Sequence, residues 1–267
     1  MKILSVFVLV FVLTAVSYAD DIDDVAYASL GGSGLITFDA AGETAGTYDG
    51  ITELGFADFG ERFLGQTLTE LNWSGDTLGY FDQLGDSDTG PQAVGSLMLV
   101  SGKPGQNLAI LDFDPNPTTN NILLGMGKLG TATAHGYGEG SFAMLFDYDQ
   151  SEIGFKLTGG NGGTAYVDFF ERDGSRIATR SIALPGNDST DVIGEFGFKL
   201  NDGTKRIAGV SIYNLDLDGI GIDDIIHDVP GIAGHPVPEP STLFLLMPAL
   251  LAVAASLRRQ KTALIDE

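Results

Sequence analysis

The sequence predicts an all-β fold, an antiparallel β-sandwich with jelly-roll-like connectivity. Apolar runs of about four to seven residues, often alternating with polar residues, have the period of strands. Asp-Gly, Asn-Gly and Gly-Gly steps use many of the 37 glycines and signal frequent tight turns. No window of helical length has a convincing 3.6-residue period, and no internal repeat of fixed period indicates a solenoid or propeller. These observations together favour two packed antiparallel sheets.

Ten segments are predicted to form the strands of two sheets, with four or five strands in each. Their ranges are Leu35–Phe38, Ser96–Val100, Leu108–Phe113, Ser141–Tyr148, Ile153–Leu157, Ala165–Phe170, Arg176–Ile182, Gly194–Leu200, Ile207–Tyr213 and Ile220–Ile226. The segment from Phe59 to Leu71 is the best exception to the strand pattern, and we expect a short helix or loop excursion there. Long loops are expected over residues 82–91 and 125–140.

The first nineteen residues have the pattern of an export signal. Lys2 supplies a basic start, residues 3–16 are almost wholly apolar, and Ser17-Tyr18-Ala19 offers small residues at the two positions that a signal peptidase reads. Cleavage after Ala19 would leave Asp20 as the first residue of the mature chain. We therefore expect residues 1–19 to be a signal peptide and residues 20–228 to form the β-sandwich domain.

The last part of the chain predicts a linker and a membrane anchor. Residues 229–240 are rich in proline and glycine, as a linker would be. The run Ser241–Leu257 has no charge, and its seventeen residues are at the short end of what spans a bilayer. Arg258-Arg259-Gln260-Lys261 follows as a basic stop that favours the cytoplasmic side. Residues 241–261 are thus expected to anchor the chain by a transmembrane helix, with the body outside.

Val237-Pro238-Glu239-Pro240-Ser241, the apolar run and the Arg258-Arg259 stop together resemble the PEP-CTERM sorting signal of Gram-negative bacteria. The resemblance covers about thirty residues, with its three parts in the expected order. It implies recognition of Pro238, Glu239 and Pro240 by an exosortase, a membrane protease. The alternative from the residues alone is an ordinary C-terminal anchor after a proline-rich linker. The implied location is first the membrane, and then the cell surface or extracellular matrix.

The charge and the cysteine content of the chain exclude several classes of partner and of site. The chain has 36 Asp and Glu against 14 Lys and Arg, a formal net charge of −22. Such a surface repels nucleic acid and anionic lipid and favours cation binding. The absence of cysteine excludes disulfides, thiol catalysis and Cys-ligated metals. The domain must therefore be held together by its own core.

The acidic stretch from Asp216 to Asp224 is the strongest candidate for a cation site. Its carboxylates and glycines suit a hard cation that takes six to eight oxygen ligands, but it fails as an EF-hand loop. Counted from Asp216, position five is Ile220 and position twelve is His227, where an oxygen ligand and a Glu are needed. The alternative is a solvated strand end in a very acidic chain.

The ending Gly219-Ile220-Gly221-Ile222-Asp223-Asp224-Ile225 resembles the close of extracellular jelly rolls, including MAM-type and galactose-binding-like modules. In several of these a structural Ca²⁺ lies where the first and last strands meet. The resemblance implies a calcium site formed by Asp39, Asp223 and Asp224, with a structural role and no part in catalysis.

Catalytic patterns are sparse in this sequence. There is no Gly-x-Ser-x-Gly elbow and no His-Glu-x-x-His zinc motif, and of the three histidines only His135 lies well inside the domain. Two carboxylates would suffice for a glycosidase, and Glu171 and Glu195 on predicted strands are candidates, although no pattern singles out a pair. No catalytic residue is assigned. Trp73, with Tyr80 and Phe81, either stacks on a sugar or belongs to the core.

The sequence predicts an exported, non-catalytic envelope or exopolysaccharide-matrix protein, with carbohydrate-binding or adhesive character. The alternative is a secreted polysaccharide hydrolase. The expected partners are an exosortase, an extracellular polysaccharide and, before processing, the membrane. The ligand-binding residues, apart from the metal and sorting candidates, are unknown.

Overall fold

The computed structural model describes nine ranges of the 267-residue chain: 21–39, 46–72, 80–85, 96–112, 121–132, 136–159, 162–184, 192–216 and 219–229. The predicted signal peptide, the linker from residue 230, the sorting tripeptide Pro238-Glu239-Pro240 and the predicted membrane helix lie outside these residues. Within the described ranges, no helix is long and apolar enough to cross a membrane.

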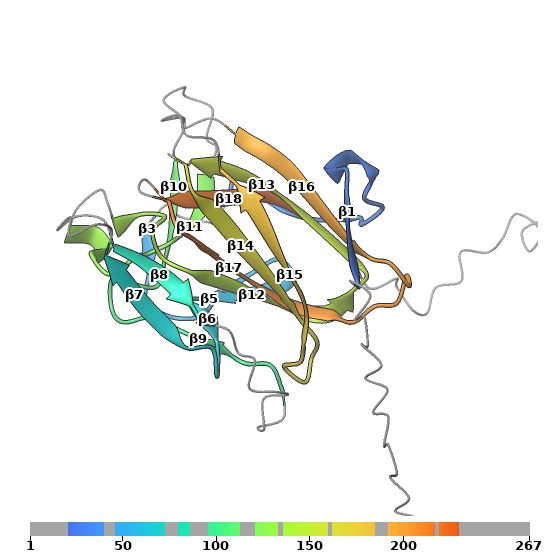
Figure 1. The fold of residues 1–267 in the computed structure, drawn as a ribbon, viewed down its shortest axis with the longest axis horizontal. Helices are drawn as coiled ribbons and strands as arrows, with labels where there is room; N and C mark the ends of the chain where they lie inside the picture. The colour runs from blue at the N-terminus through green and yellow to red at the C-terminus, as the bar shows by residue number, and fades with distance from the viewer. Residues whose placement is uncertain are drawn as a thin grey trace, which may run out of the picture. The chain divides into compact units, whose positions relative to one another are not determined.

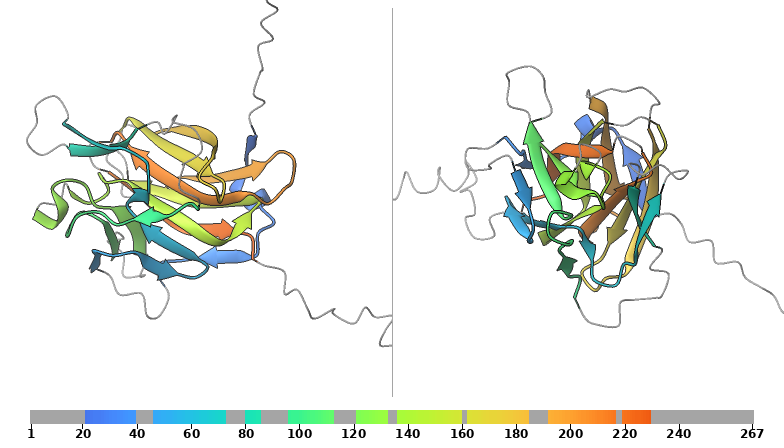
Figure 2. Two further views of the ribbon diagram at one scale, coloured as in Figure 1. Left: turned by 90° about the horizontal axis from the view of Figure 1, so that it is seen from below. Right: turned by 90° about the vertical axis from the view of Figure 1, so that its left-hand side faces the viewer.

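Two large antiparallel sheets form the domain (Figures 1 and 2). The eight-stranded sheet has the order β1 (Ile22–Val25), β16 (Val192–Leu200), β13 (Glu152–Gly159), β18 (Ile220–His227), β11 (Asn121–Gly125), β10 (Leu108–Asp112) and β3 (Gly46–Tyr48), with β2 (Gly34–Ile36) also paired to β18. The six-stranded sheet has the order β15 (Arg176–Ala183), β14 (Thr164–Phe170), β17 (Ile207–Asn214), β12 (Phe142–Gln150), β5 (Ala57–Gly60) and β4 (Thr52–Leu54).

Two short ribbons accompany the sheets. One pairs β6 (Arg62–Phe63) with β9 (Leu99–Val100), and the other is the hairpin of β7 (Leu68–Asn72) and β8 (Tyr80–Leu84). The described residues otherwise contain only two 3₁₀ turns, at Tyr27–Ser29 and Gly130–Ala132.

From β12 onward the chain passes repeatedly between the two sheets. Strands β12, β14, β15 and β17 belong to the six-stranded sheet, and β13, β16 and β18 to the eight-stranded sheet. Only β14 and β15 are consecutive partners within one sheet in this region. The last strand, β18, is not at an edge, because it pairs with β13, β11 and β2.

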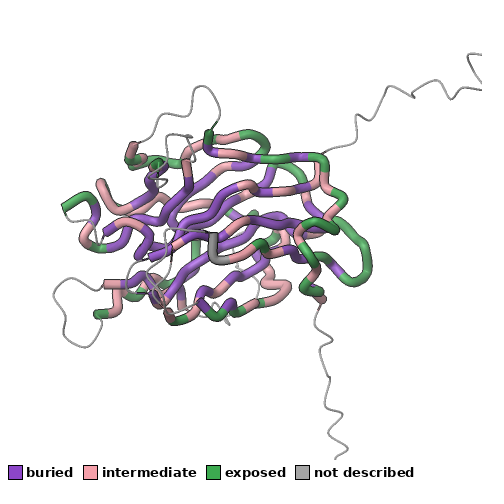
Figure 3. The backbone as a smooth tube through the Cα atoms, turned by 90° about the horizontal axis from the view of Figure 1, so that it is seen from above, coloured by how far each residue is buried: buried purple, intermediate pink, exposed green. Residues whose placement is uncertain are grey.

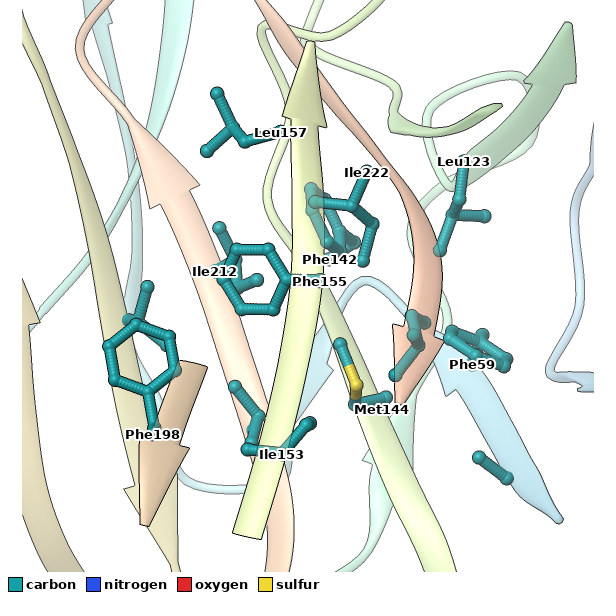
Figure 4. Packing of buried hydrophobic residues seen from close by; sticks show 14 of the residues in the cluster. Phe59, Leu123, Phe142, Met144, Ile153, Phe155, Leu157, Phe198, Ile212 and Ile222 are labelled. Atoms are coloured by element: carbon teal, nitrogen blue, oxygen red, sulfur yellow. The ribbon is translucent and has the colours of Figure 1, made fainter. Parts of the chain in front are cut away.

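One large apolar cluster, formed by buried residues of both sheets, makes up the core (Figure 4), and Figure 3 shows how the buried residues follow the strands. Strand alternation produces it: Val167 and Phe169 of β14 belong to the core, whereas Tyr166 and Asp168 do not. The members labelled in Figure 4 are Phe59, Leu123, Phe142, Met144, Ile153, Phe155, Leu157, Phe198, Ile212 and Ile222. At about 25 cal/mol per Å² of buried apolar surface, such a core can stabilise the domain without disulfides.

The all-β prediction is confirmed, and each of the ten predicted segments overlaps an observed strand. The expected helix or loop between Phe59 and Leu71 is wrong, because the structure has the end of β5, then β6 and most of β7 there. Phe59 and Phe63 are both buried and lie four residues apart. That spacing fits one face of a helix as well as one face of a strand, so periodicity could not separate the two.

Gly34→Ala is expected to destabilise the domain by about 1–3 kcal/mol. A Cβ at Gly34 would lie 2.4 Å from Cε1 of His227, and the His227 ring is itself packed against the rings of Phe56 and Phe146. Gly50→Ala is the matched control, because a Cβ there meets nothing within 4 Å. Urea-unfolding midpoints measure both; equal midpoints for the two variants would contradict this account of the packing.

Candidate functional site

The outer face of the six-stranded sheet is partly covered and partly open. Phe63 and Leu97 pack on it over Ala143, Phe170 and Ala208 and form a second small apolar cluster. The neighbouring part of the same face carries residues that alternate with the core. On β17, Val210 and Ile212 are core residues, so Ser211 and Tyr213 face outward.

A groove of about 440 Å³ lies on the open part of this face. Its lining residues come from β8, β14, β15 and β17, and β8 contacts β17. The lining residues are Gln83, Leu84, Tyr166, Asp168, Arg176, Thr179 and Tyr213. The volume is within the range of roughly 300–1,000 Å³ typical of small-ligand sites.

Two stacked tyrosines form the aromatic part of the groove. Tyr166 and Tyr213 are direct partners in the pairing of β14 with β17. Their ring centroids are 4.9 Å apart and their planes differ by 13°. Tyr213 is almost buried, whereas Tyr166 is half-buried and presents aromatic surface to the groove. A rigid aromatic surface with few rotatable bonds suits the apolar face of a flat ligand.

Polar groups surround the tyrosine pair. Asp168 on β14 lines the groove with little of its surface exposed, and it accepts a hydrogen bond from the Thr179 hydroxyl, which fixes its position. Arg176 and Gln83 add hydrogen-bond donors from β15 and β8. An apolar surface with a few fixed polar groups is the usual composition of a small-molecule site.

Asp82 precedes Gln83 on β8 but does not line the groove. It is buried, and its Oδ2 lies 3.4 Å from the backbone nitrogen of Ser141. Burial raises the pKa of Asp82 to about 7, while the Ser141 N–H opposes the rise. The Asp82 carboxyl is therefore easily protonated, but its burial keeps it away from a ligand in the groove.

The structure brings two of the three predicted metal ligands near one another. Asp39 follows β2, and its carboxylate accepts a hydrogen bond of 2.6 Å from the Asn121 N–H. Asp223 is buried on β18. Its pKa is raised to about 6, mainly by burial and also by the negative charges of Asp224 and Asp39, while hydrogen bonds from the Asp224 and Phe38 N–H groups oppose the rise. Its Oδ1 has no hydrogen-bond partner.

Asp224 is separated from this pair by an irregularity in the strand. The register of β13 with β18 shifts between Gly154 and Lys156, and Asp224 has a φ of 48°. Among the described residues it is the one non-glycine with positive φ. Its carboxylate lies 2.7 Å from the Lys156 ammonium, while its carbonyl accepts a 2.6 Å hydrogen bond from the Tyr27 hydroxyl. This irregularity in the strand gives the neighbouring carboxylates of Asp223 and Asp224 different partners.

The pair of Asp39 and Asp223 fits a cation only in part. Two carboxylates would have to be completed by carbonyl or water oxygens, since Ca²⁺ takes six to eight ligands. Within the described ranges, no group of three or more His, Cys, Asp or Glu side chains is arranged to hold a metal ion. The acidic stretch is also extended: Asp216 precedes β18, whereas Asp223 and Asp224 lie within it. Calcium at this strand end stays a prediction.

Several of the other sequence candidates lie outside the residues that the structure describes. Trp73, His135, His235 and Asp218 are outside the described residues. Phe81 is buried in the interior. The Tyr80 ring has the Lys128 ammonium 4.4 Å from its centroid.

The two glutamates considered for hydrolysis belong to different sheets. Glu171 follows β14 in the six-stranded sheet and accepts a hydrogen bond of 2.9 Å from Arg206. Glu195 is on β16 in the eight-stranded sheet, 4.0 Å from the Lys156 ammonium.

Comparison with known proteins identifies one feature of the chain, a PEP-CTERM protein-sorting motif over residues 236–260. The chain is thus an exported protein directed to an exosortase. No curated protein matches the sequence.

Three solved structures show weak likeness. The enzymatically active domain of tailspike protein 4 from bacteriophage CBA120 is 14% identical over 46% of this chain and 18% of that chain, with a TM-score of 0.28. The CBM22-1–GH10 modules of the Clostridium thermocellum endo-1,4-β-D-xylanase 10B, complexed with xylohexaose, are 13% identical over 48% of this chain and 25% of that chain, with a TM-score of 0.28. CsCBM6-3 from Clostridium stercorarium, in complex with cellobiose, is 11% identical over 46% of this chain and 82% of that chain, with a TM-score of 0.26. At these TM-scores the likeness carries no weight for the ligand or activity of this chain.

Asp82→Asn is expected to make the free energy of unfolding less dependent on pH between about pH 4 and 7. A folded-state pKa of about 7, above the ordinary 3.8, means that the folded state binds this proton more tightly. The resulting stability is fully present below pH 3.8 and is lost as the pH rises through 7. The full difference is about 4 kcal/mol. Urea unfolding at pH 4.5 and pH 8 measures it, and parallel profiles for variant and wild type would refute it.

Asp223→Asn tests the predicted calcium site at fixed pH. If Asp39 and Asp223 hold Ca²⁺, calcium raises the melting temperature of the wild type by several degrees over chelator and does not raise that of the variant. Asp224→Asn is the matched control, because its carboxylate pairs with Lys156, and this variant should keep its response to calcium. The same calcium response in wild type and Asp223→Asn would remove this metal site.

Proposed function

We propose that the exported domain is a non-catalytic carbohydrate-binding module that holds the protein in the cell envelope or in an exopolysaccharide matrix. The observation that carries the proposal is the Tyr166–Tyr213 stack in a groove with fixed polar groups. A sugar ring has an apolar face that packs on an aromatic ring and hydroxyls that need hydrogen-bond partners. Asp168, Thr179 and Arg176 supply such partners beside the tyrosines.

The body is further proposed to have jelly-roll connectivity, which the repeated passage of the chain between the sheets supports. Location and ligand agree in this proposal. The sorting motif implies that the chain is exported, and extracellular polysaccharide is available to an exported protein. A surface with a net charge of −22 favours neutral ligands over anionic ones, which the field of the protein repels.

The alternative is a polysaccharide hydrolase. Glycosidases need two carboxylates on either side of the scissile bond, about 5–9.5 Å apart. Asp168 is the one carboxylate among the described residues that line the groove. This favours binding over hydrolysis.

Tyr166→Ala is expected to weaken glycan binding at least about tenfold, equivalent to 1.4 kcal/mol, because it removes the half-buried ring that the stack presents to the groove. A glycan array, run with calcium and with chelator, identifies the ligand, and calorimetry gives the affinities. Tyr148→Ala is the matched control, since Tyr148 is an exposed tyrosine outside the groove. Equal affinity of wild type and Tyr166→Ala would overturn the proposal, and release of shorter glycans during the assay would favour the hydrolase.

A further inference from the structure

A second groove, of about 280 Å³, lies between the edges of the two sheets. One part of its lining comes from β15, the end strand of the six-stranded sheet in the described part of the chain, and the other from β1 and β16 of the eight-stranded sheet. The apolar lining includes Ile182, Phe196 and Phe198, and the polar lining includes Arg180 and Ser181. This mixture of an apolar surface and a few polar groups is the composition expected of a small-molecule site.

Phe196 gives the second groove an aromatic ring in a fixed position. The ring is half-buried and packs against the main core, with its centroid 6.3 Å from that of the Phe155 ring. Phe198, two residues further along β16, belongs to the core, so alternation directs Phe196 toward the same inner side of the sheet. The accessible part of the Phe196 ring can pack against the apolar face of a sugar, as can that of Tyr166.

Arg180 links the two sheets at the second groove. Its Nε donates a hydrogen bond of 2.9 Å to the Asp24 carboxylate on β1, and its Nη2 donates one to the Ile22 carbonyl. The Arg180 side chain is only 15% exposed. Because this link holds β15 and β1 at a fixed separation, a ligand meets a preformed site and loses little affinity to ordering it.

The first groove, which Tyr166 and Tyr213 line, meets the second groove at β15. Tyr166 pairs in register with Ser181, which lines the second groove. Directly opposite residues of an antiparallel pair lie on the same face of the sheet, so the Ser181 side chain is next to that of Tyr166. Thr179 and Arg180 are consecutive on β15, and they line the first and the second groove respectively.

Tyr213, Tyr166 and Ser181 form a row across three neighbouring strands. Tyr166 on β14 is the register partner of Tyr213 on β17 and of Ser181 on β15. Since neighbouring strands are about 4.8 Å apart, the row is about 10 Å long. It leads from the first groove to the beginning of the second. A chain-like ligand that lies along this row can therefore occupy both grooves at once.

We propose that the two grooves are subsites for one glycan, so that the domain binds a stretch of several sugars within a long neutral polysaccharide. This rests on the proposed function of the first groove, and it adds Phe196, Ser181 and Arg180 as binding residues. A glycan held in the first groove is presented to the second at a high effective concentration, so weak contacts there raise the affinity. A short glycan that fills only the first groove gains nothing from them.

Calorimetry of the full-length chain tests this proposal, with length series of neutral β-1,4-linked glucan, xylan and mannan oligosaccharides as probes. In a series that binds, the hexasaccharide is expected to bind about tenfold more tightly than the disaccharide. Phe196→Ala is expected to remove most of that advantage and to leave the affinity for the disaccharide unchanged, whereas Tyr166→Ala weakens both. Phe56→Ala is the matched control, because Phe56 is an exposed phenylalanine that lines neither groove.

Ala183→Arg provides a second variant, because Phe196 also packs against the core and its loss can lower stability. Ala183 is exposed and lines the second groove but not the first, so the arginine side chain is expected to obstruct only the second groove. Hexasaccharide affinity equal to wild type in both variants would overturn the second subsite and leave the proposed function in place. Equal weakening of disaccharide and hexasaccharide by both variants would also overturn it. Failure of the wild type to bind any oligosaccharide would remove both proposals.

Discussion

The dry core between the two sheets is the constraint on which the rest of this molecule depends. A chain with a net charge of −22 and no cysteine has neither internal charge balance nor covalent links to hold it together. Burial of residues such as Phe142, Phe155 and Phe169 must offset that repulsion. Since side chains alternate along each strand, the same burial decides which residues remain outside. Tyr166 and Asp168 line the groove because Val167 and Phe169 point into the core.

How far the sequence predicts this structure depends on whether a feature is local. Alternation within one segment predicts β14 and β17, and the carboxylates at Asp39 and Asp223 follow from local motifs. The stacking of Tyr166 on Tyr213 depends on the register of two strands that are about fifty residues apart, which no local pattern specifies. The carboxylates of Asp223 and Asp224 have different partners because the strand is irregular at this point. Asp224 adopts a positive φ there although it is not glycine, which a sequence pattern does not indicate. The groove was therefore not predicted from the sequence.

Some polar residues inside the domain have hydrogen-bond partners, whereas others lower the stability of the fold because they are buried. Asn214 donates a hydrogen bond of 2.8 Å to the Gly138 carbonyl, and Gln66 donates one of 2.9 Å to the Ser211 hydroxyl, so both support the fold. Asp82 and Asp223 are different, because burial disfavours their charged forms. Groups of this kind are often functional, since a fold keeps them at a loss of stability. Asp82 and Asp223, the two aspartates with raised pKa values, both lie outside the groove.

The interior position of β18 has a consequence for secretion. This strand is the last of the domain to be synthesised, yet β13, β11 and β2 all pair with it. The eight-stranded sheet remains incomplete until residues 220–227 have emerged on the far side of the membrane. The final pairing of β13, β11 and β2 therefore waits for the segment of the domain that is made last, so a chain truncated before residue 220 would lack the strand that joins these three.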